Sequence, residues 1–163
     1  MPTVILDTPQ GGLFAVLPEK LRDAGFTTAA TPPATLLVTA SGDADAAIAA
    51  AYAFAGALAP RQQALIVIIL RAHAPDDWPA ARTAATLWAF TRHAALAWAP
   101  RGIRVNAVGL GISPNLPGQP VEESGRPAGP APAAPATPDD LAETILAIWR
   151  FPSMTCQLIR LAA

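Results

Sequence analysis

One segment of the sequence brings an imidazole close to carboxylates. His73 is followed by Asp76 and Asp77, and all three come directly after the apolar run 64–70. These residue types at this spacing suit acid–base chemistry or the binding of a metal ion. They also suit a solvated polar loop, which is the commoner context for such residues. We therefore predict no metal site.

A second segment has the composition of a phosphate-binding turn. Gly11 and Gly12 follow the apolar run 3–6 and precede a helical pattern. Glycines before a helix let backbone N–H groups approach a phosphate closely. The same pair also fits a simple turn between a strand and a helix. The chemistry of this segment therefore depends on the elements around it.

Composition excludes several classes of protein. The chain has 163 residues, a net charge of −1, 52% hydrophobic residues, 14% charged residues and one cysteine. The near-neutral charge argues against a nucleic-acid partner, and a single cysteine excludes an internal disulfide. The apolar runs are too short for a signal peptide or a membrane span. We expect a single cytoplasmic domain, 1–163, without a membrane partner.

Apolar runs and turn residues predict the elements that position these candidates. The run 64–70, ALIVIIL, is apolar on both faces, as buried parallel strands are. Strands alternate with helices, which predicts an α/β fold: a Rossmann-like parallel sheet of about six strands with helices on both faces. Segment 113–137 is rich in proline and reads as a flexible loop. Strands are expected at 3–6, 26–30, 35–39, 64–70, 103–108 and 157–161. Helices are expected at 11–24, with the regular part beginning near Pro18, at 43–59, at 79–99 and from 138 onward.

The second half of the chain carries a specific resemblance. Trp88–Gly111, WAFTRHAALAWAPRGIRVNAVGLG, closely resembles the short-chain dehydrogenase/reductase family, in which the active-site helix leads into a strand IRVNAV. Thr137–Glu143 resembles the start of the family's last helix. Pro152–Gln157 resembles its closing turn, with Cys156 where glycine is usual. The resemblance implies a nicotinamide-dependent oxidoreductase fold. Family domains are much longer, so we expect a shortened member, with the loss around the second and third strands.

The resemblance also implies a catalytic set, which this sequence lacks. The family uses a Tyr-x-x-x-Lys pair one helical turn apart, and the aligned positions here are Ala80 and Ala84. The chain's one tyrosine, Tyr52, has Gly56 four residues later, so no alignment restores the pair. The family's serine is expected in 71–81, which holds neither serine nor threonine, and its helper asparagine is also missing. We therefore predict no catalytic residues of the family type.

The cofactor loop departs from the family pattern as well. The family's Thr-Gly-x-x-x-Gly-x-Gly motif corresponds to residues 7–14, where Thr8 and Phe14 replace two of the glycines. Asp7 adds a negative charge beside the expected diphosphate position. We expect no cofactor, with NAD(P) binding kept as an alternative. The vestigial cofactor-binding residues are Gly11, Gly12 and Gly42.

The helix 79–99 carries large apolar side chains around more than one face. One face must cover the sheet, and the other exposes aromatic residues unless it packs on a partner. The alanine-rich helix 43–59 offers a flat neighbouring surface, and family members usually assemble through these two helices. We expect a dimer or tetramer, or a hetero-oligomer with an active family member; the alternative is that these side chains complete the domain's own core. The candidate interface residues are Leu87, Trp88, Phe90, Leu96 and Trp98.

These observations lead to one functional hypothesis and two alternatives. The leading hypothesis is a non-catalytic short-chain dehydrogenase-like protein that acts as a binding or assembly subunit. The first alternative is a divergent NAD(P)-dependent oxidoreductase that uses another proton donor, such as His73 or a bound water. The second is a small-ligand binding protein that uses the vacated pocket between the strand ends and 113–137.

Overall fold

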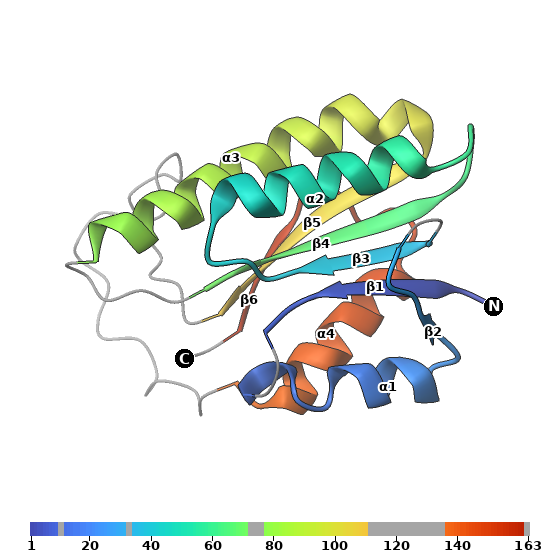
Figure 1. The fold of residues 1–163 in the computed structure, drawn as a ribbon, viewed down its shortest axis with the longest axis horizontal. Coiled ribbons are helices and arrows are strands. Elements are labelled where there is room, and N and C mark those ends of the chain that lie inside the picture. Colours follow the sequence, from blue (N-terminus) through green and yellow to red (C-terminus); the bar gives the residue numbers. More distant parts are fainter. Residues whose placement is uncertain (10–11, 32–33, 72–76, 111–135, 162–163) are drawn as a thin grey trace.

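The structure is a computed structural model, and it describes residues 1–9, 12–31, 34–71, 77–110 and 136–161 (Figure 1). The strands are β1 (Thr3–Asp7), β2 (Thr27–Thr28), β3 (Leu36–Thr39), β4 (Ala64–Leu70), β5 (Ile103–Leu110) and β6 (Leu158–Leu161). The helices are α1 (Leu17–Asp23), α2 (Ala44–Ala57), α3 (Trp78–Trp98) and α4 (Pro138–Arg150), with short 3-10 turns η1 (Gly12–Phe14) and η2 (Ala99–Arg101).

All six strands form one parallel sheet in the order β2-β1-β3-β4-β5-β6. The predicted α/β fold with a Rossmann-like sheet of about six strands is therefore confirmed. The usual Rossmann order, 3-2-1-4-5-6, places two strands beyond the first strand. Here that position holds only the two-residue β2. The half of the fold that usually holds one mononucleotide of a dinucleotide is thus reduced, in the region where the sequence predicted the loss.

Helices cover both faces of the sheet because successive strand residues point to opposite sides. Leu65 and Val67 of β4 pack with α1 and α4, whereas Ile66 and Ile68 pack with α2 and α3. Every residue of β4 is buried, as its continuous apolar run predicted. Figure 1 shows the two layers, with α2 and α3 above the sheet and α1 and α4 below it.

Proline and capping residues mark the starts of the helices. Asp77 caps α3 by accepting a hydrogen bond from the Ala80 N–H at 3.1 Å, and Asp43 caps α2 through the Asp45 N–H at 3.0 Å. The regular part of α1 begins beside Pro18, after the separate 3-10 turn η1, because proline is tolerated only in the first turn of a helix. All of these helices start at the end of the sheet where strands finish, which we call the carboxyl edge.

The motif IRVNAV has a structural role in this chain. The Asn106 side chain is fully buried; its amide donates to the Met154 carbonyl at 3.0 Å and its Oδ1 accepts from the Gln157 N–H at 3.0 Å. These bonds join β5 to the turn before β6. Cys156 lies in that turn with φ of +59°, a backbone conformation that glycine adopts without strain. This conformation explains why the resembling family has glycine there.

Arg104, in the same motif, closes the end of α4. Its Nη1 donates to the carbonyls of Ile148, Phe151 and Met154 at 3.0, 3.0 and 3.2 Å, and its Nη2 donates to the Trp149 carbonyl at 3.3 Å. The last carbonyls of a helix have no partner within the helix, and here the Arg104 guanidinium supplies the donors that a C-cap would otherwise provide. Partial burial lowers the pKa of Arg104, which nevertheless stays protonated at any physiological pH.

A reciprocal cap starts α4. The Thr137 hydroxyl accepts from the Asp140 N–H at 3.2 Å, and Asp140 Oδ2 accepts from both the backbone N–H and the hydroxyl of Thr137 at 2.7 Å. This is the capping box that the sequence Thr-Pro-Asp-Asp favours. The hydrogen bonds from the Thr137 backbone and side chain lower the pKa of Asp140, because they stabilise the ionised carboxylate.

This cap makes the stability of the chain depend on pH. Because the pKa of Asp140 is lower in the folded state, its contribution is complete above the unfolded pKa of about 3.9 and is lost as pH falls through the folded pKa. We expect Asp140→Asn to reduce stability at neutral pH and to flatten its dependence on pH below about 4. Urea unfolding at neutral and acidic pH measures both effects. If the free energy of unfolding of Asp140→Asn changed between neutral and acidic pH as much as that of wild type, this role would be refuted.

Candidate functional site

A small cavity lies at the carboxyl edge, where active sites of open α/β folds are placed. It has a volume of about 190 Å³ and lies between the end of β4, the β3–α2 turn and the first turns of α3. Ala80 and Ala84, one helical turn apart on α3, both line it. The lining residues are Ser41, Gly42, Ile69, Arg71, Ala80, Thr83, Ala84 and Leu87.

The two hydroxyl groups of this cavity are committed to local backbone contacts. Ser41 Oγ accepts from the Asp43 N–H at 3.1 Å, and Thr83 Oγ1 donates to the Pro79 carbonyl at 3.1 Å. Arg71 is the one charged side chain among the described lining residues, and it is exposed. These residues include no carboxylate, imidazole, phenol or amine that could exchange a proton near neutral pH.

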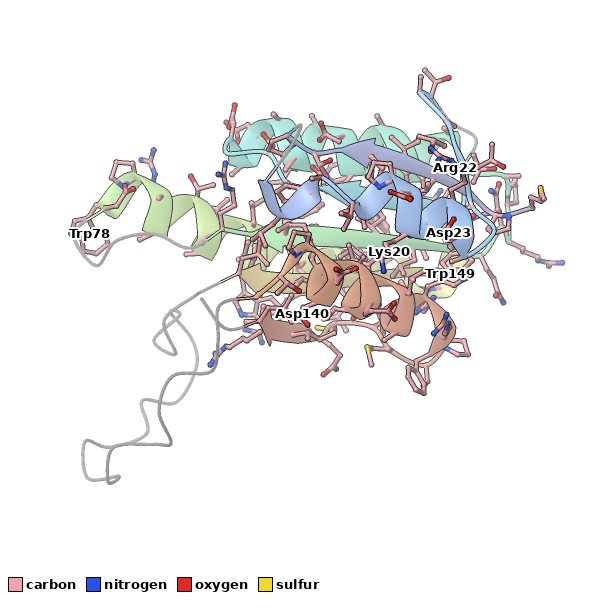
Figure 2. The ribbon with its side chains drawn as sticks, turned by 90° about the horizontal axis from the view of Figure 1, so that it is seen from below. Lys20, Arg22, Asp23, Trp78, Asp140 and Trp149 are labelled. Atoms are coloured by element: carbon pink, nitrogen blue, oxygen red, sulfur yellow. The ribbon has the colours of Figure 1, made fainter. Side chains whose placement is uncertain are left out.

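The chain's single tyrosine and single lysine lie on opposite faces of the sheet. The Tyr52 ring, on α2, contacts Phe90 and Trp98, with centroid distances of 5.8 and 5.2 Å. Lys20 is on α1, where its Nζ lies 2.7 Å from Asp139 Oδ1 at the start of α4 (Figure 2). The two side chains that the family pairs on one helix are thus separated by the whole sheet.

The vestigial glycine loop retains one conformational requirement. Gly12 has φ of +57° and begins η1, so this position favours glycine, and Gly11 lies outside the described residues. The Phe14 side chain is only 8% exposed and belongs to the core beneath β1. The Asp7 carboxylate, at the end of β1, accepts a hydrogen bond from the Thr39 hydroxyl at 2.7 Å. A side chain at Gly42 would meet no atom within 4 Å.

Charge is unevenly distributed between the two ends of the strands. The carboxyl edge carries the caps and first-turn acids of the helices, and the opposite end, which we call the amino edge, carries arginines that follow the helices. The sorting is partial, because Lys20 and Arg71 lie at the carboxyl edge and Asp23 ends α1 at the amino edge. Acidic side chains stabilise helix starts and basic ones stabilise helix ends, so parallel α/β packing sorts them by edge. The acids at the carboxyl edge are Asp7, Glu19, Asp43, Asp45, Asp77, Asp139 and Asp140. The arginines at the amino edge are Arg22, Arg61, Arg101, Arg104 and Arg150.

The candidate acid–base segment is only partly described. His73 and Asp76 lie outside the described residues, as does most of segment 113–137, whereas Asp77 serves as the cap of α3. Within the described part of the chain, no three His, Cys, Asp or Glu side chains gather closely enough to hold a metal ion. None of the described helices is both long and apolar enough to cross a membrane.

The five candidate interface residues divide into two groups. Leu87, Phe90 and Trp98 are buried in the chain's own core between α2, α3 and the sheet, and Phe90 and Trp98 stack edge to face at 5.9 Å. Trp88 is half-buried against the same core. Leu96 points outward, with 75% of its side chain exposed. A partner on this face would therefore meet Leu96 and part of Trp88, and the other three shape the surface from beneath.

Solved structures share this arrangement of elements. The 3-ketoacyl-(acyl-carrier-protein) reductase of Brucella melitensis, complexed with NADH, aligns with a TM-score of 0.70 and 13% identity over 99% of this chain and 96% of its own. FolM alternative dihydrofolate reductase 1 of Brucella canis, complexed with NADP, aligns with a TM-score of 0.67 and 21% identity over 98% of this chain and 92% of its own. A short-chain dehydrogenase/reductase of Brucella ovis aligns with a TM-score of 0.65 and 15% identity over 98% of this chain and 99% of its own.

The chain has the short-chain dehydrogenase/reductase fold. The resemblance in the sequence is thus confirmed at the level of fold. At 163 residues the chain is shorter than typical members of this family. No family model and no curated protein matches the sequence.

Proposed function

We propose that this chain is a non-catalytic protein of the short-chain dehydrogenase/reductase fold that acts as a binding or assembly subunit. The observation that supports the proposal is that Ala80 and Ala84 line the carboxyl-edge cavity. The sequence resemblance aligns these two positions with the family's tyrosine and lysine. Methyl groups neither donate a proton to a carbonyl nor lower the pKa of a neighbour. Tyr52 and Lys20 cannot replace them, because they lie on opposite faces of the sheet.

The residues at the carboxyl edge do not fit a dinucleotide. A diphosphate carries negative charge, and Asp7 ends the strand beside the expected phosphate position, with Asp43 and Asp77 starting the neighbouring helices. Phe14 occupies a position where the resembling motif has glycine for close approach of backbone and cofactor. The reduced strand β2 also removes part of the surface that such a cofactor usually covers. We therefore include the loss of NAD(P) binding in the proposal.

The outer face of α2 and α3 supports the assembly role. The exposed residues of α2 are mostly small, which allows a partner helix to approach closely, whereas those of α3 include Arg82, Arg92 and His93. The two helices carry three large exposed apolar side chains, one of which, Trp78, starts α3 and is 79% exposed. Tyr52 is 53% exposed and Leu96 is 75% exposed. The partner we propose is a second copy of this chain, with an active relative of the same fold as the alternative. The small exposed residues are Ala46, Ala49, Ala53, Gly56 and Ala57 on α2, and Ala89 and Ala97 on α3.

Size-exclusion chromatography with light scattering tests the assembly. We expect the wild-type chain to elute as a dimer or tetramer at micromolar concentration and Leu96→Glu to elute as a monomer, because a buried unpaired carboxylate opposes association. Phe151→Glu is the matched control: Phe151 is 57% exposed but lies after α4, away from this face. A strictly monomeric wild type, or equal dissociation in both variants, would overturn the assembly role.

Calorimetric titration with NADH and NADPH tests whether the chain has lost the ability to bind a nicotinamide cofactor. We expect no binding up to millimolar cofactor, because the carboxyl edge is acidic and Phe14 fills the glycine position. Tryptophan fluorescence during the same titration provides an independent readout. Micromolar binding would contradict this part of the proposal and would favour the divergent oxidoreductase instead.

A further inference from the structure

A larger cavity lies at the amino edge, opposite the carboxyl-edge cavity. Its volume is about 580 Å³, within the range of about 300–1,000 Å³ typical of small-molecule sites. It is formed where β4 and β5 begin and where α3 and α4 end. The lining residues are Gln63, Ala64, Ala99, Gly102, Ile103, Arg104, Trp149, Arg150, Pro152 and Thr155.

The polar lining of this amino-edge cavity consists of donors without an opposing acid. Arg104 and Arg150 supply two guanidinium groups, and no aspartate or glutamate is among the lining residues. Arg150 has no hydrogen-bond or ion-pair partner within the described part of the chain, and the Gln63 side chain has none either. Two donors therefore remain free to bind an incoming group, next to Arg104, which is partly buried and held by backbone carbonyls.

The local charge balance favours an anion even though helices end here. The carbonyl ends of α3–η2 and α4 each contribute roughly half a negative charge. Arg104 and Arg150 contribute two full positive charges, so the cavity keeps a surplus of about one positive charge. Arg101 adds to it nearby, although its Nη2 donates to the Ala55 carbonyl at 2.5 Å and so caps α2. Arg101 and Arg104 therefore have a structural role, because they cap helix ends. Arg150 caps no helix end, so its position in the cavity has no such structural explanation.

The remaining wall is apolar and includes an indole. Trp149 packs edge to face on Phe26, with ring centroids 5.0 Å apart, so its position is fixed from the far side. Pro152, which is exposed, adds aliphatic surface. Figure 2 places Trp149 at the end of the molecule opposite Trp78, which starts α3. A cavity with one apolar wall and one cationic wall suits a ligand with a ring and a negatively charged group.

We propose that the amino-edge cavity binds a small organic anion, a carboxylate or phosphate ester on a planar ring, with Arg150 as its principal ligand. The anion lies between Arg150 and the fixed guanidinium of Arg104, and the ring lies against Trp149 and Pro152. This site is independent of the carboxyl-edge cavity and of the assembly face. It would give the chain a ligand-binding role that does not need the family's cofactor.

Isothermal titration with phenyl phosphate, benzoate and uncharged benzyl alcohol tests this site. We expect at least one of the two anions to bind in the millimolar range or tighter, more weakly at high salt, and benzyl alcohol not to bind. Arg150→Gln should weaken the binding by about tenfold or more, because it removes a charge-assisted hydrogen bond. Arg22→Gln is the matched control, since Arg22 lies at the same edge but does not line the cavity.

The outcomes separate the site from a diffuse field of positive charge. A loss of affinity confined to Arg150→Gln, with a melting temperature equal to that of wild type, supports the assigned ligand. Preference between phenyl phosphate and benzoate then identifies the class of anion. Equal weakening in Arg150→Gln and Arg22→Gln, equal binding of benzyl alcohol, or no binding of either anion at millimolar concentration would overturn the proposal.

Discussion

Replacing Arg104 with methionine is expected to lower the free energy of unfolding by about 2–4 kcal/mol. The guanidinium donates to four backbone carbonyls, those of Ile148, Trp149, Phe151 and Met154. Methionine keeps most of the aliphatic volume but removes the guanidinium from all four carbonyls, although those of Phe151 and Met154 still accept from the Met154 N–H and the Asn106 amide. Water replaces some of the lost bonds because the site is only partly buried, and this limits the loss. Urea denaturation followed by tryptophan fluorescence measures the effect.

Arg92→Met is the control for Arg104→Met. Arg92 is exposed on α3 and has no partner within the described residues, so its replacement should change stability by less than about 0.5 kcal/mol. The fluorescence of Trp149, at the end of α4, should also change in Arg104→Met, because the last turn of that helix loosens. Equal stability of the two variants would show that the four hydrogen bonds contribute nothing net.

The second large effect is expected from Trp98→Ala, at about 3–5 kcal/mol of destabilisation. Trp98 is buried between α2 and α3 and contacts both Tyr52 and Phe90 in an edge-to-face arrangement. Its removal leaves a large cavity and also ends two aromatic contacts. Because Trp98 belongs to the chain's own core, the loss should not depend on protein concentration. Thermal unfolding at several concentrations, with a chemical denaturant series at one of them, measures it.

Leu96→Ala should behave in the opposite way. Leu96 is exposed, so its truncation should leave the unfolding of a monomer almost unchanged and should act only on association. A concentration-dependent loss in Leu96→Ala together with a concentration-independent loss in Trp98→Ala would separate the surface of α3 from its buried side. Concentration-dependent destabilisation in Trp98→Ala would refute the assignment of Trp98 to the core.

Local sequence signals predicted the elements of this fold well. The apolar run 64–70 coincides with β4, and the predicted helices 43–59 and 79–99 correspond to α2 and α3 within two residues at each end. These signals are short-range: apolar periodicity, capping acids, and prolines at helix starts. They establish which segments are buried strands, and parallel topology follows because the intervening helices act as crossovers.

Features that depend on distant residues could not be predicted in this way. Arg104 appeared only as part of a family motif, and the carbonyls that it binds lie 44 to 50 residues further along the chain. The burial of Leu87, Phe90 and Trp98 depends on how α2 packs beside α3, which no pattern within α3 reveals. The amino-edge cavity likewise combines residues from four separate segments. The sequence shows alanine at positions 80 and 84, but it does not show that both residues line one cavity.

The partial sorting of acids and arginines to opposite ends of the strands gives a nearly neutral chain a dipole of side-chain charges, which the helix macrodipoles oppose in part. Two such molecules placed side by side attract when their dipoles are antiparallel and repel when they are parallel. A pair formed through the outer face of α2 and α3 would thus favour a twofold axis perpendicular to the strands, which places the acidic end of each copy beside the basic end of the other. Near a charged surface, the same asymmetry would orient a single molecule before any specific contact forms.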